Sequence, residues 1–397
     1  MVHLNERKII MADEKSKATL LKEEIFMKGK KGVAALSAEE VEKADDFCVG
    51  YKEFLDHSPV EREAVSYTLE LAKKAGFTEY DENASYNAGD KVYYVNRDKA
   101  IALAVIGKNG VKNGARLAIA HIDSPRIDLK PNPLYEDTNL ALFKTHYYGG
   151  LKKYQWTALP LSLHGTVVKL DGTKVNITWG DDENESCFCV TDLLPHLAKD
   201  QVSKPLAKVF TGEDLNVLVG SRPYEDGNDE KDLVKLNVMS ILNKKYGIVE
   251  GDFLSAELCL IPSFKARDIG FDASMIGGYG HDDKVCAYPA LMASLDVETP
   301  EQTCVTYLTD KEETGSDGNT GMQSDFLRYF IYDLAKQDGI DGYKALSKST
   351  CLSADVSAAY DPTYASAYEA KNSCYINEGV AVSYTHLRAH ETLMNLV

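Results

Sequence analysis

The spacing of apolar residues predicts two amphipathic helices and then extended segments in the first part of the chain. Apolar positions recur at helical spacing in SAEEVEKADDFCVGYKEFLDHS and in SPVEREAVSYTLELAKKAGF. Ser37 and Glu40 form a capping box for the first helix. The second helix can be capped by Ser58 and stops at Gly76. KVYYVNRDKAIALAVIGKNG has the pattern of a hairpin-like strand pair, and ARLAIAHIDSP that of a short buried strand ending at His121.

The middle of the chain changes to short runs in which apolar and polar residues alternate. HGTVVKL, KVNITWG and LNVLVGS are such runs, and they are separated by polar turns such as DGTK and GDDENES. This pattern predicts a β-rich insertion over residues 126–234 with a small core of its own.

After the insertion, strand and helix patterns alternate. LVKLNVMSILNKKYGI and GMQSDFLRYFIYDLAKQDG have helical periodicity, whereas SAELCLIPS and TCVTYLT have the pattern of strands. Such alternation is typical of an α/β sheet covered by helices on both faces, and ligands of these sheets bind beyond the carboxyl ends of the strands. We therefore predict an α/β main domain formed by residues 1–125 and 235–382, interrupted by the insertion.

Composition narrows the class of protein. The 397 residues are 44% hydrophobic and 26% charged, which is enough to bury a proper core. The net charge of −17 argues against nucleic acid and anionic membranes as partners, because both favour clustered Lys and Arg. The eight cysteines are scattered, and the N-terminal segment lacks the apolar region of a signal peptide. We expect a cytoplasmic protein with free thiols and no membrane span.

Four short blocks carry the groups that suggest chemistry. The first is AHIDSP, where the imidazole of His121 is a good zinc ligand and Asp123 is placed to hold that ring in one tautomer. The second is GHDDK, where the two oxygens of Asp282 can bridge two cations. Asp283 is the weaker ligand candidate, because both aspartates also suit the N-terminus of the helix that follows.

The other two blocks supply further carboxylates. In DKEETGS, adjacent residues of an extended segment point in opposite directions, so Glu313 is assigned to the metal and Glu312 to the general base. In SADVSAAYDP, Asp355 follows a short strand and precedes small residues that leave room for a cation. Taken alone, each block also fits a structural role such as a helix cap or an acidic turn. The four together, at expected strand ends, favour two nearby cations and metal-assisted hydrolysis.

The segment 383–397, SYTHLRAHETLMNLV, breaks with the preceding pattern. It resembles translated sequencing-adapter sequence, so we predict a non-native tail and expect the natural C-terminus to be missing. The alternative is a genuine metal-binding helix, because His386 and His390 lie four positions apart with Glu391 next to them.

These motifs resemble the M18 family, the aspartyl aminopeptidase and aminopeptidase I group of di-zinc exopeptidases. The resemblance runs from about residue 15 to residue 382 and is carried by AHIDSPRIDLKPNP, HYYGGLKKYQW, LPHLA, AELCLIP, GHDDKVCAY, DKEETGS and SADVSAAYDP. It implies a Zn-peptidase-like α/β catalytic domain, an inserted β-rich dimerisation domain and assembly of the chain with itself into dimers and a tetrahedral dodecamer. It also implies peptide substrates with a free N-terminus.

The resemblance further implies a division of roles between residues. His121 and Asp355 would bind one zinc ion and Glu313 the other, with Asp282 bridging them. Carboxylate-rich sites of this kind also accept Mn²⁺ or Co²⁺. Glu312 would be the general base.

Two more roles follow from the resemblance. Asp123 would orient the imidazole of the first ligand. His196, in LPHLA, would reach into the active site of a neighbouring subunit.

Two departures from the family pattern leave alternatives open. The family's last zinc ligand, a histidine near the C-terminus, lies in a stretch that this chain does not have. The alternative to an active enzyme is therefore a non-catalytic assembly subunit or a truncated inactive product. The chain also reads QWTALPL where aspartyl-selective members carry W-x-D-R, so neutral or broad specificity is as consistent as acidic specificity. A further alternative, nearer in chemistry to an aminopeptidase, is an amidase or deacylase with the same fold.

Overall fold

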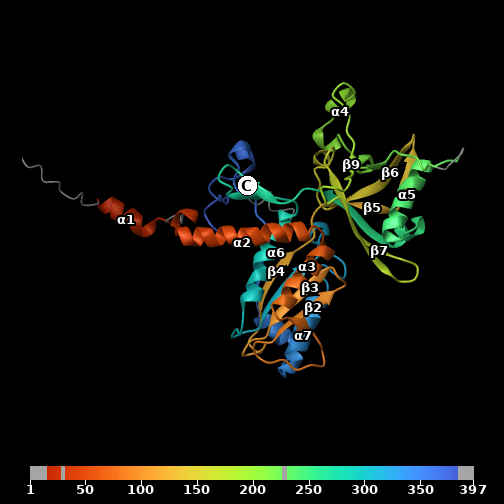
Figure 1. Cartoon of the computed structure of the whole chain (residues 1–397). Helices are drawn as coiled ribbons and strands as arrows, with labels where there is room; N and C mark the ends of the chain where they lie inside the picture. Colours follow the sequence, from red (N-terminus) through yellow and green to blue (C-terminus); the bar gives the residue numbers. More distant parts are fainter. Residues whose placement is uncertain (1–15, 28–31, 226–229, 383–397) are drawn as a thin grey trace, which may run out of the picture. The chain divides into compact units, whose positions relative to one another are not determined.

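The computed structural model describes residues 16–27, 32–225 and 230–382 (Figure 1). The chain divides into two compact units, one formed by residues 1–47 with 357–397 and the other by residues 48–356. Within the described ranges, none of the helices combines the length and apolarity that crossing a bilayer requires.

The smaller unit contains short helices and little sheet. Its elements are α1 (Lys17–Ile25), η1 (Val33–Ala35), the beginning of α2 (Ala38–His57) and η7 (Pro362–Ala367). Ser37 caps α2 as predicted, since its hydroxyl accepts from the Glu40 N–H while the Glu40 carboxylate accepts from the Ser37 N–H. Near the end of the described chain, the rings of Tyr360 and Tyr375 stack 5.1 Å apart.

The larger unit is built on two large sheets, the first of which is mixed, and it also contains a two-stranded sheet of β12 (Arg267–Ile269) and β13 (Met275–Gly277). The strand order of the first sheet is β1-β2-β3-β14-β4-β15, and the last three strands run parallel to one another. The predicted hairpin is its antiparallel β2–β3 pair. The strands are β1 (Thr78–Glu79), β2 (Lys91–Asn96), β3 (Ala100–Val105), β14 (Cys304–Thr309), β4 (Arg116–His121) and β15 (Thr350–Ser353).

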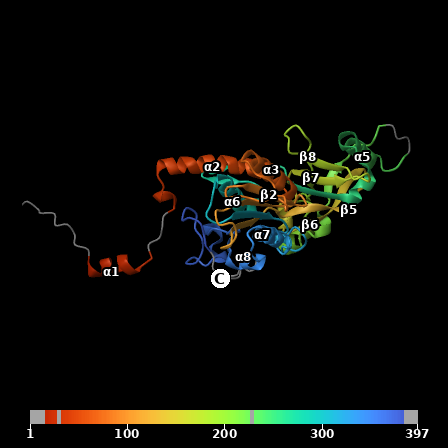
Figure 2. The ribbon, with the colours of Figure 1, turned by 90° about the horizontal axis from the view of Figure 1, so that it is seen from below.

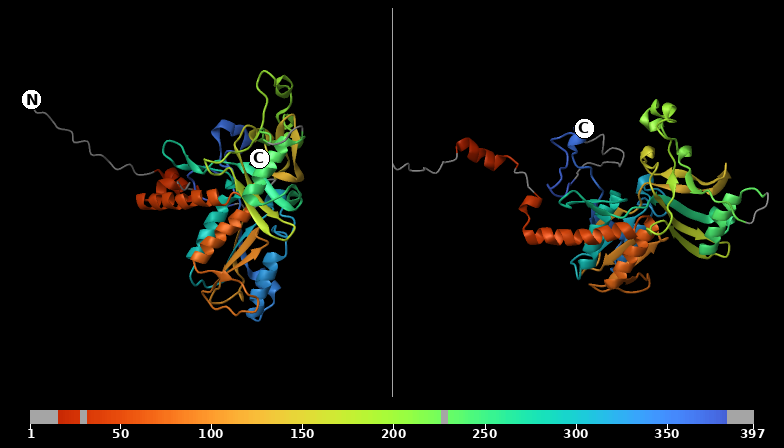
Figure 3. Two further views of the ribbon diagram at one scale, coloured as in Figure 1. Left: turned by 45° about the vertical axis from the view of Figure 1, so that its right-hand side comes forward. Right: turned by 45° about the horizontal axis from the view of Figure 1, so that its top comes forward.

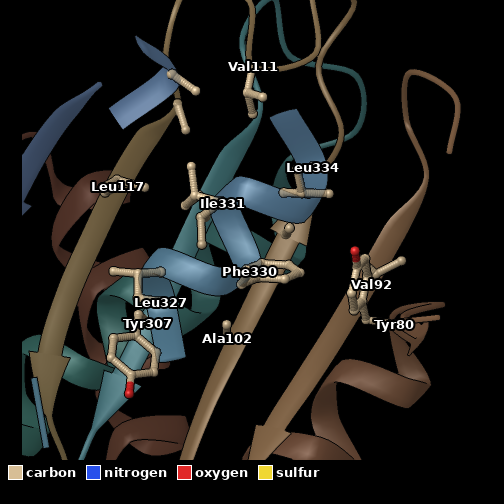
Figure 4. Packing of buried hydrophobic residues seen from close by; sticks show 14 of the residues in the cluster. Tyr80, Val92, Ala102, Val111, Leu117, Tyr307, Leu327, Phe330, Ile331 and Leu334 are labelled. Atoms are coloured by element: carbon tan, nitrogen blue, oxygen red, sulfur yellow. The ribbon is translucent and has the colours of Figure 1, made fainter. Parts of the chain in front are cut away.

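Helices cover both faces of this first sheet, as predicted (Figure 2). The helices are α2, α3 (Glu61–Lys74) and α6 (His281–Asp296) on one face, and α7 (Phe326–Gln337) and α8 (Gly342–Lys348) on the other. Successive residues of a strand point to opposite faces, so Ala102 of β3 packs toward Phe330 of α7 while Leu103 faces the other core. Figure 4 shows the first of these cores, in which Tyr80 meets Phe330 edge to face at 5.0 Å.

The second sheet is antiparallel and has the order β8-β7-β11-β5-β6-β10-β9. Its strands, coloured yellow to green in Figure 3, are β5 (Arg126–Asp137), β6 (Leu140–Tyr148), β7 (Leu161–Val168), β8 (Lys174–Trp179), β9 (Cys189–Val190), β10 (Val217–Gly220) and β11 (Ala256–Pro262). Helix α5 (Leu233–Tyr246) packs on this sheet through Val234 and Leu242. The core of the insertion therefore continues beyond residue 234, and we propose a domain boundary near residue 262.

The first turn of α3 joins the two sheets. Its three successive charged residues each pair with a different strand of the second sheet: Glu61 with Arg126 of β5 at 2.9 Å, Arg62 with Glu257 of β11 at 3.0 Å, and Glu63 with His164 of β7 at 3.0 Å. These strands are neighbours in the sheet. The junction therefore combines these ion pairs with an apolar cluster of Val60 with Cys259 and Ile261 of β11.

The start of α3 differs from the prediction. Val60 occupies the N-cap position, and the Ser58 hydroxyl is buried without a hydrogen-bond partner among the described residues, so the predicted Ser58 cap is wrong. The predicted end is confirmed, because Gly76 follows the C-cap with a φ of 86°.

Candidate metal centre

Three neighbouring parallel strands bring candidate residues to one edge of the first sheet. His121 is the last residue of β4, Asp355 follows β15, and Glu312 follows β14. Because the carboxyl ends of parallel strands meet at the same edge, their side chains lie close together. The predicted strand-end positions are confirmed for these three residues.

Asp282 reaches the same place from a helix rather than from a strand end. It lies in the first turn of α6, after Gly280 with a φ of 84°, so the expectation that all four blocks end strands is wrong for this one. Its Oδ1 lies 3.1 Å from Nε2 of His121. The Ser124 hydroxyl donates to the backbone carbonyl of Asp282 at 2.9 Å and accepts from the buried Lys284 ammonium at 2.9 Å. This chain of contacts fixes the backbone that carries the carboxylate.

His121, Asp282 and Asp355 form a group that fits a metal ion. One ligand atom from each lies within 4.8 Å of the others. An imidazole nitrogen with two carboxylate oxygens is a donor set typical of Zn²⁺. His121 is buried, whereas Asp282 and Asp355 are exposed, so an ion and a substrate can reach the group from solvent. Asp283 is fully buried and does not belong to it.

Asp123 is fully buried and organises the residues around it. Nδ1 of His121 hydrogen-bonds to the backbone carbonyl of Asp123 at 3.0 Å and lies 3.3 Å from Oδ1 of its carboxylate, which leaves Nε2 facing the other carboxylates. The same carboxylate accepts from the backbone N–H groups of Glu312 and Glu313, each at 3.2 Å. It also accepts from the Tyr148 hydroxyl at 2.6 Å. Asp123 therefore holds both the histidine ring and the turn that carries the two glutamates.

The two glutamates lie on a 3-10 turn instead of an extended segment. The turn η6 (Glu312–Thr314) follows Lys311, whose φ is 72°. The predicted extended conformation is therefore wrong, and neighbouring side chains of this turn need not point in opposite directions. Oε2 of Glu312 lies 3.7 Å from Nε2 of His121. Glu313 lies against Gly149, where an added Cβ would be 2.9 Å from its Oε2.

The electrostatics of the centre favour a bound cation. Burial opposes protonation of His121, but hydrogen bonds to Asp123 and Asp282 raise the pKa of its imidazole to about 11. Burial and the charge of Asp282 raise the pKa of Glu313 to about 8 and also raise the pKa of Asp355. Carboxylates that raise one another's pKa in this way repel, and a divalent cation relieves that repulsion.

His196 lies away from this group, and Glu312 and Glu313, on their own turn, also stand outside the set of three whose ligand atoms lie within 4.8 Å of one another. His196 is exposed on the segment between β9 and α4 (Lys199–Val202). No hydrogen bond or ion pair in the described part of the chain connects it to the other candidates. The sequence pattern does not single out Tyr148, Ser124 or Lys284, although they lie inside the motifs HYYGGLKKYQW, AHIDSP and GHDDK respectively.

A histidine and carboxylates at the strand ends of a helix-covered sheet define a centre typical of metal-dependent hydrolases. Residues 54–392 match the family described as Aminopeptidase I zinc metalloprotease (M18), and the chain belongs to this family. It is therefore a metal-dependent aminopeptidase. The family resemblance and the α/β fold predicted from the sequence are both confirmed.

Relatives from bacteria share most of the chain. It is 48% identical over 347 residues to a probable M18 family aminopeptidase 1 of Clostridium acetobutylicum. The matched residues cover 85% of this chain and 74% of the relative. The crystal structure of an M18 family aminopeptidase from Thermotoga maritima has a TM-score of 0.84 at 40% identity and covers 89% of this chain and 78% of that one. The Clostridium acetobutylicum aminopeptidase I structure has a TM-score of 0.76 at 46% identity, and the match covers 83% of this chain and 73% of that one.

The family match continues to residue 392 and so includes part of the segment 383–397. That segment lies outside the described residues, and with it the alternative ligands His386, His390 and Glu391. Both readings of the segment stay predictions.

Proposed function

We propose that this chain removes N-terminal amino acids from peptides with the help of two zinc ions. The observation that carries the proposal is the grouping of His121, Asp282 and Asp355 within 4.8 Å. Glu312 and Glu313 lie beside that group on one turn. One imidazole and three carboxylates, those of Asp282, Glu313 and Asp355, would be donors to the two ions, and Glu312 is kept for the proton transfer.

The ligands would divide between the two ions. In this proposal His121 and Asp355 would hold one ion and Glu313 the other, with Asp282 serving both. The orientation of His121 supports this division, because Asp123 occupies Nδ1 and leaves Nε2 directed at Asp282. Zinc bound there would polarise the scissile carbonyl and lower the pKa of a water molecule to about 7.

Glu312 carries the proton in this proposal. It takes a proton from the attacking water and gives it to the leaving amine. Its carboxylate is half-buried and faces the ligand atoms, with Oε2 3.7 Å from Nε2 of His121. The acidic surroundings favour a substrate whose free α-amine is protonated, which is the group an aminopeptidase must recognise.

Glu312→Gln tests the base assignment, with the exposed Glu298→Gln as the matched control. The amide cannot accept the proton, so we expect kcat to fall by about 10²- to 10⁴-fold at unchanged zinc content. Near-full turnover with unchanged zinc would make the assignment wrong.

Two further measurements test the metal and the substrate. Dialysis against a chelator should abolish activity, and readdition should restore it at two zinc ions per chain. Cleavage of a free-amine peptide but not of its N-acetylated form separates an aminopeptidase from an amidase or deacylase. Saturation at a single ion would contradict the two-zinc proposal.

We also propose that the chain assembles with itself, as a dimer and a dodecamer, and that His196 stabilises the oxyanion in a neighbouring subunit. Its neighbours Leu193, Leu194 and Leu197 are exposed, as is common at interaction surfaces. A neighbour from Saccharomyces cerevisiae, the mApe1 dodecamer, is 20% identical, so its likeness to this chain concerns the fold alone.

Mixing two inactive variants tests the shared site. In hybrids of His196→Ala and Glu312→Gln subunits, a site with an intact base can receive His196 from its neighbour, so part of the activity should return. Hybrid assemblies without any recovered activity would contradict the role of His196.

A further inference from the structure

We propose that Tyr148 is a positioning residue of the metal centre, supplied by the second sheet. Tyr148 is the last residue of β6, and its hydroxyl donates to Oδ2 of Asp123 at 2.6 Å. Through that carboxylate it holds His121 together with the turn of Glu312 and Glu313. The inference rests on the proposed function, because it concerns the same site.

The hydrogen bonds of Asp123 explain why one hydroxyl matters. Oδ1 faces His121 and accepts from the Glu312 N–H, while Oδ2 accepts from the Glu313 N–H at 3.2 Å and from Tyr148. The Tyr148 bond is the shortest of these contacts. Without it, the carboxylate keeps only two 3.2 Å bonds from backbone N–H groups, so it is held less firmly against the imidazole, whose Nδ1 also hydrogen-bonds to the Asp123 backbone carbonyl at 3.0 Å.

The ring of Tyr148 is itself fixed by charged neighbours. The Arg126 guanidinium lies 4.1 Å from the ring centroid, and Lys311 Nζ lies 5.3 Å from it. Arg126 is held in turn by Glu61 at 2.9 Å and Asp128 at 2.8 Å. The direction of the hydroxyl is therefore set by contacts of the second sheet and of α3.

The hydroxyl also remains a donor under working conditions. Burial and the charge of Asp123 raise the pKa of Tyr148 well above its usual value. Because the phenol stays protonated, the hydrogen bond persists wherever Asp123 is ionised.

Tyr148→Phe tests the inference, with Tyr147→Phe as the matched control on the same strand. Tyr147 is exposed, and within the described residues its hydroxyl makes no hydrogen bond. Tyr148→Phe removes one oxygen atom and keeps the ring under Arg126, so the variant should fold. We expect its zinc Kd, measured by chelator competition, to rise about tenfold, and its kcat to fall with KM nearly unchanged. The control should match the parent chain.

The outcomes separate this inference from the proposed function. If the parent chain binds no zinc, the proposed function is contradicted before any variant is compared. A parent chain that binds zinc, together with a Tyr148→Phe variant of equal Kd and kcat, would overturn the inference alone. A lower Tm at unchanged zinc Kd would assign Tyr148 a structural role and would overturn it too.

Discussion

Gly149→Ala probes how closely the second sheet approaches the metal centre. Gly149 follows β6 with a φ of 71°, and an added Cβ would lie 2.9 Å from Oε2 and 3.1 Å from Cβ of Glu313. Two effects follow from one methyl group. The backbone must hold alanine in a left-handed conformation, and the side chain of Glu313 must move.

The two effects differ in what they damage. A left-handed alanine costs about 1–2 kcal/mol of folding free energy. The nearest obstructed atom is the tip of a flexible side chain, and the Glu313 carboxylate must move by about 0.5 Å to reach an ordinary separation, while Cβ of Glu313 at 3.1 Å must also shift slightly. Metal–ligand distances tolerate only about 0.2 Å. The larger loss should therefore fall on zinc bound by Glu313, at about tenfold or more in affinity.

Zinc titration with a competing chelator resolves the two binding steps, and urea unfolding gives the stability. Gly150→Ala is the matched control, because an added Cβ there meets nothing within 4 Å. We expect Gly149→Ala to weaken one zinc step selectively and the control to leave both unchanged. The reasoning is refuted if Gly149→Ala binds both ions like the parent chain, or if both variants lose the same step.

Three further predictions concern stability. Burial opposes protonation of His164, but hydrogen bonds to Asp181 and Glu63 raise its pKa to about 9. Because the pKa in the unfolded chain is about 6.5, protonation of His164 contributes up to about 3 kcal/mol to the free energy of unfolding. This contribution is fully present below about pH 6.5 and is lost as the pH rises through about 9. Urea unfolding at about pH 6 and pH 9.5 should show that loss, and His164→Gln should remove the difference. Glu61→Gln removes a buried carboxylate from Arg126 and Lys99, which keep Asp128 and Glu257 as partners, and should cost about 3 kcal/mol in urea unfolding, whereas a loss below about 1 kcal/mol would contradict a buried ion pair. Phe330→Ala empties a fully buried site and should cost about 3–5 kcal/mol with zinc affinity unchanged, so weaker zinc binding would show that this core also supports the centre.

The positions of the candidate metal ligands could be predicted because local sequence determines where strands end. His121 closes an apolar run, and Asp355 follows a short strand, so each is placed by a pattern a few residues long. Parallel pairing then brings them together without any further information. Asp282 fits less well, because a Gly-rich loop and a helix carry it to the site.

Other features depend on contacts that a local pattern does not contain. Tyr148 matters through a bond to a residue 25 positions earlier, on a different structural element. Ser58 has the chemistry of a cap, but tertiary packing buries it and starts the helix three residues later. Similarly, β11 has the pattern of a main-domain strand, and only its pairing with β7 and β5 places it in the second sheet.

The first turn of α3 has a consequence for how the chain is assembled during synthesis. Successive helical residues point about 100° apart, which lets Glu61, Arg62 and Glu63 reach three neighbouring strands at once. The partner of Arg62 is Glu257, 195 positions later. A nascent chain must therefore keep these charges solvated until β11 has been made, and a register slip in any of the three strands would leave a charge unpaired. The full set of these ion pairs can therefore form only after the strands of both sheets have been synthesised.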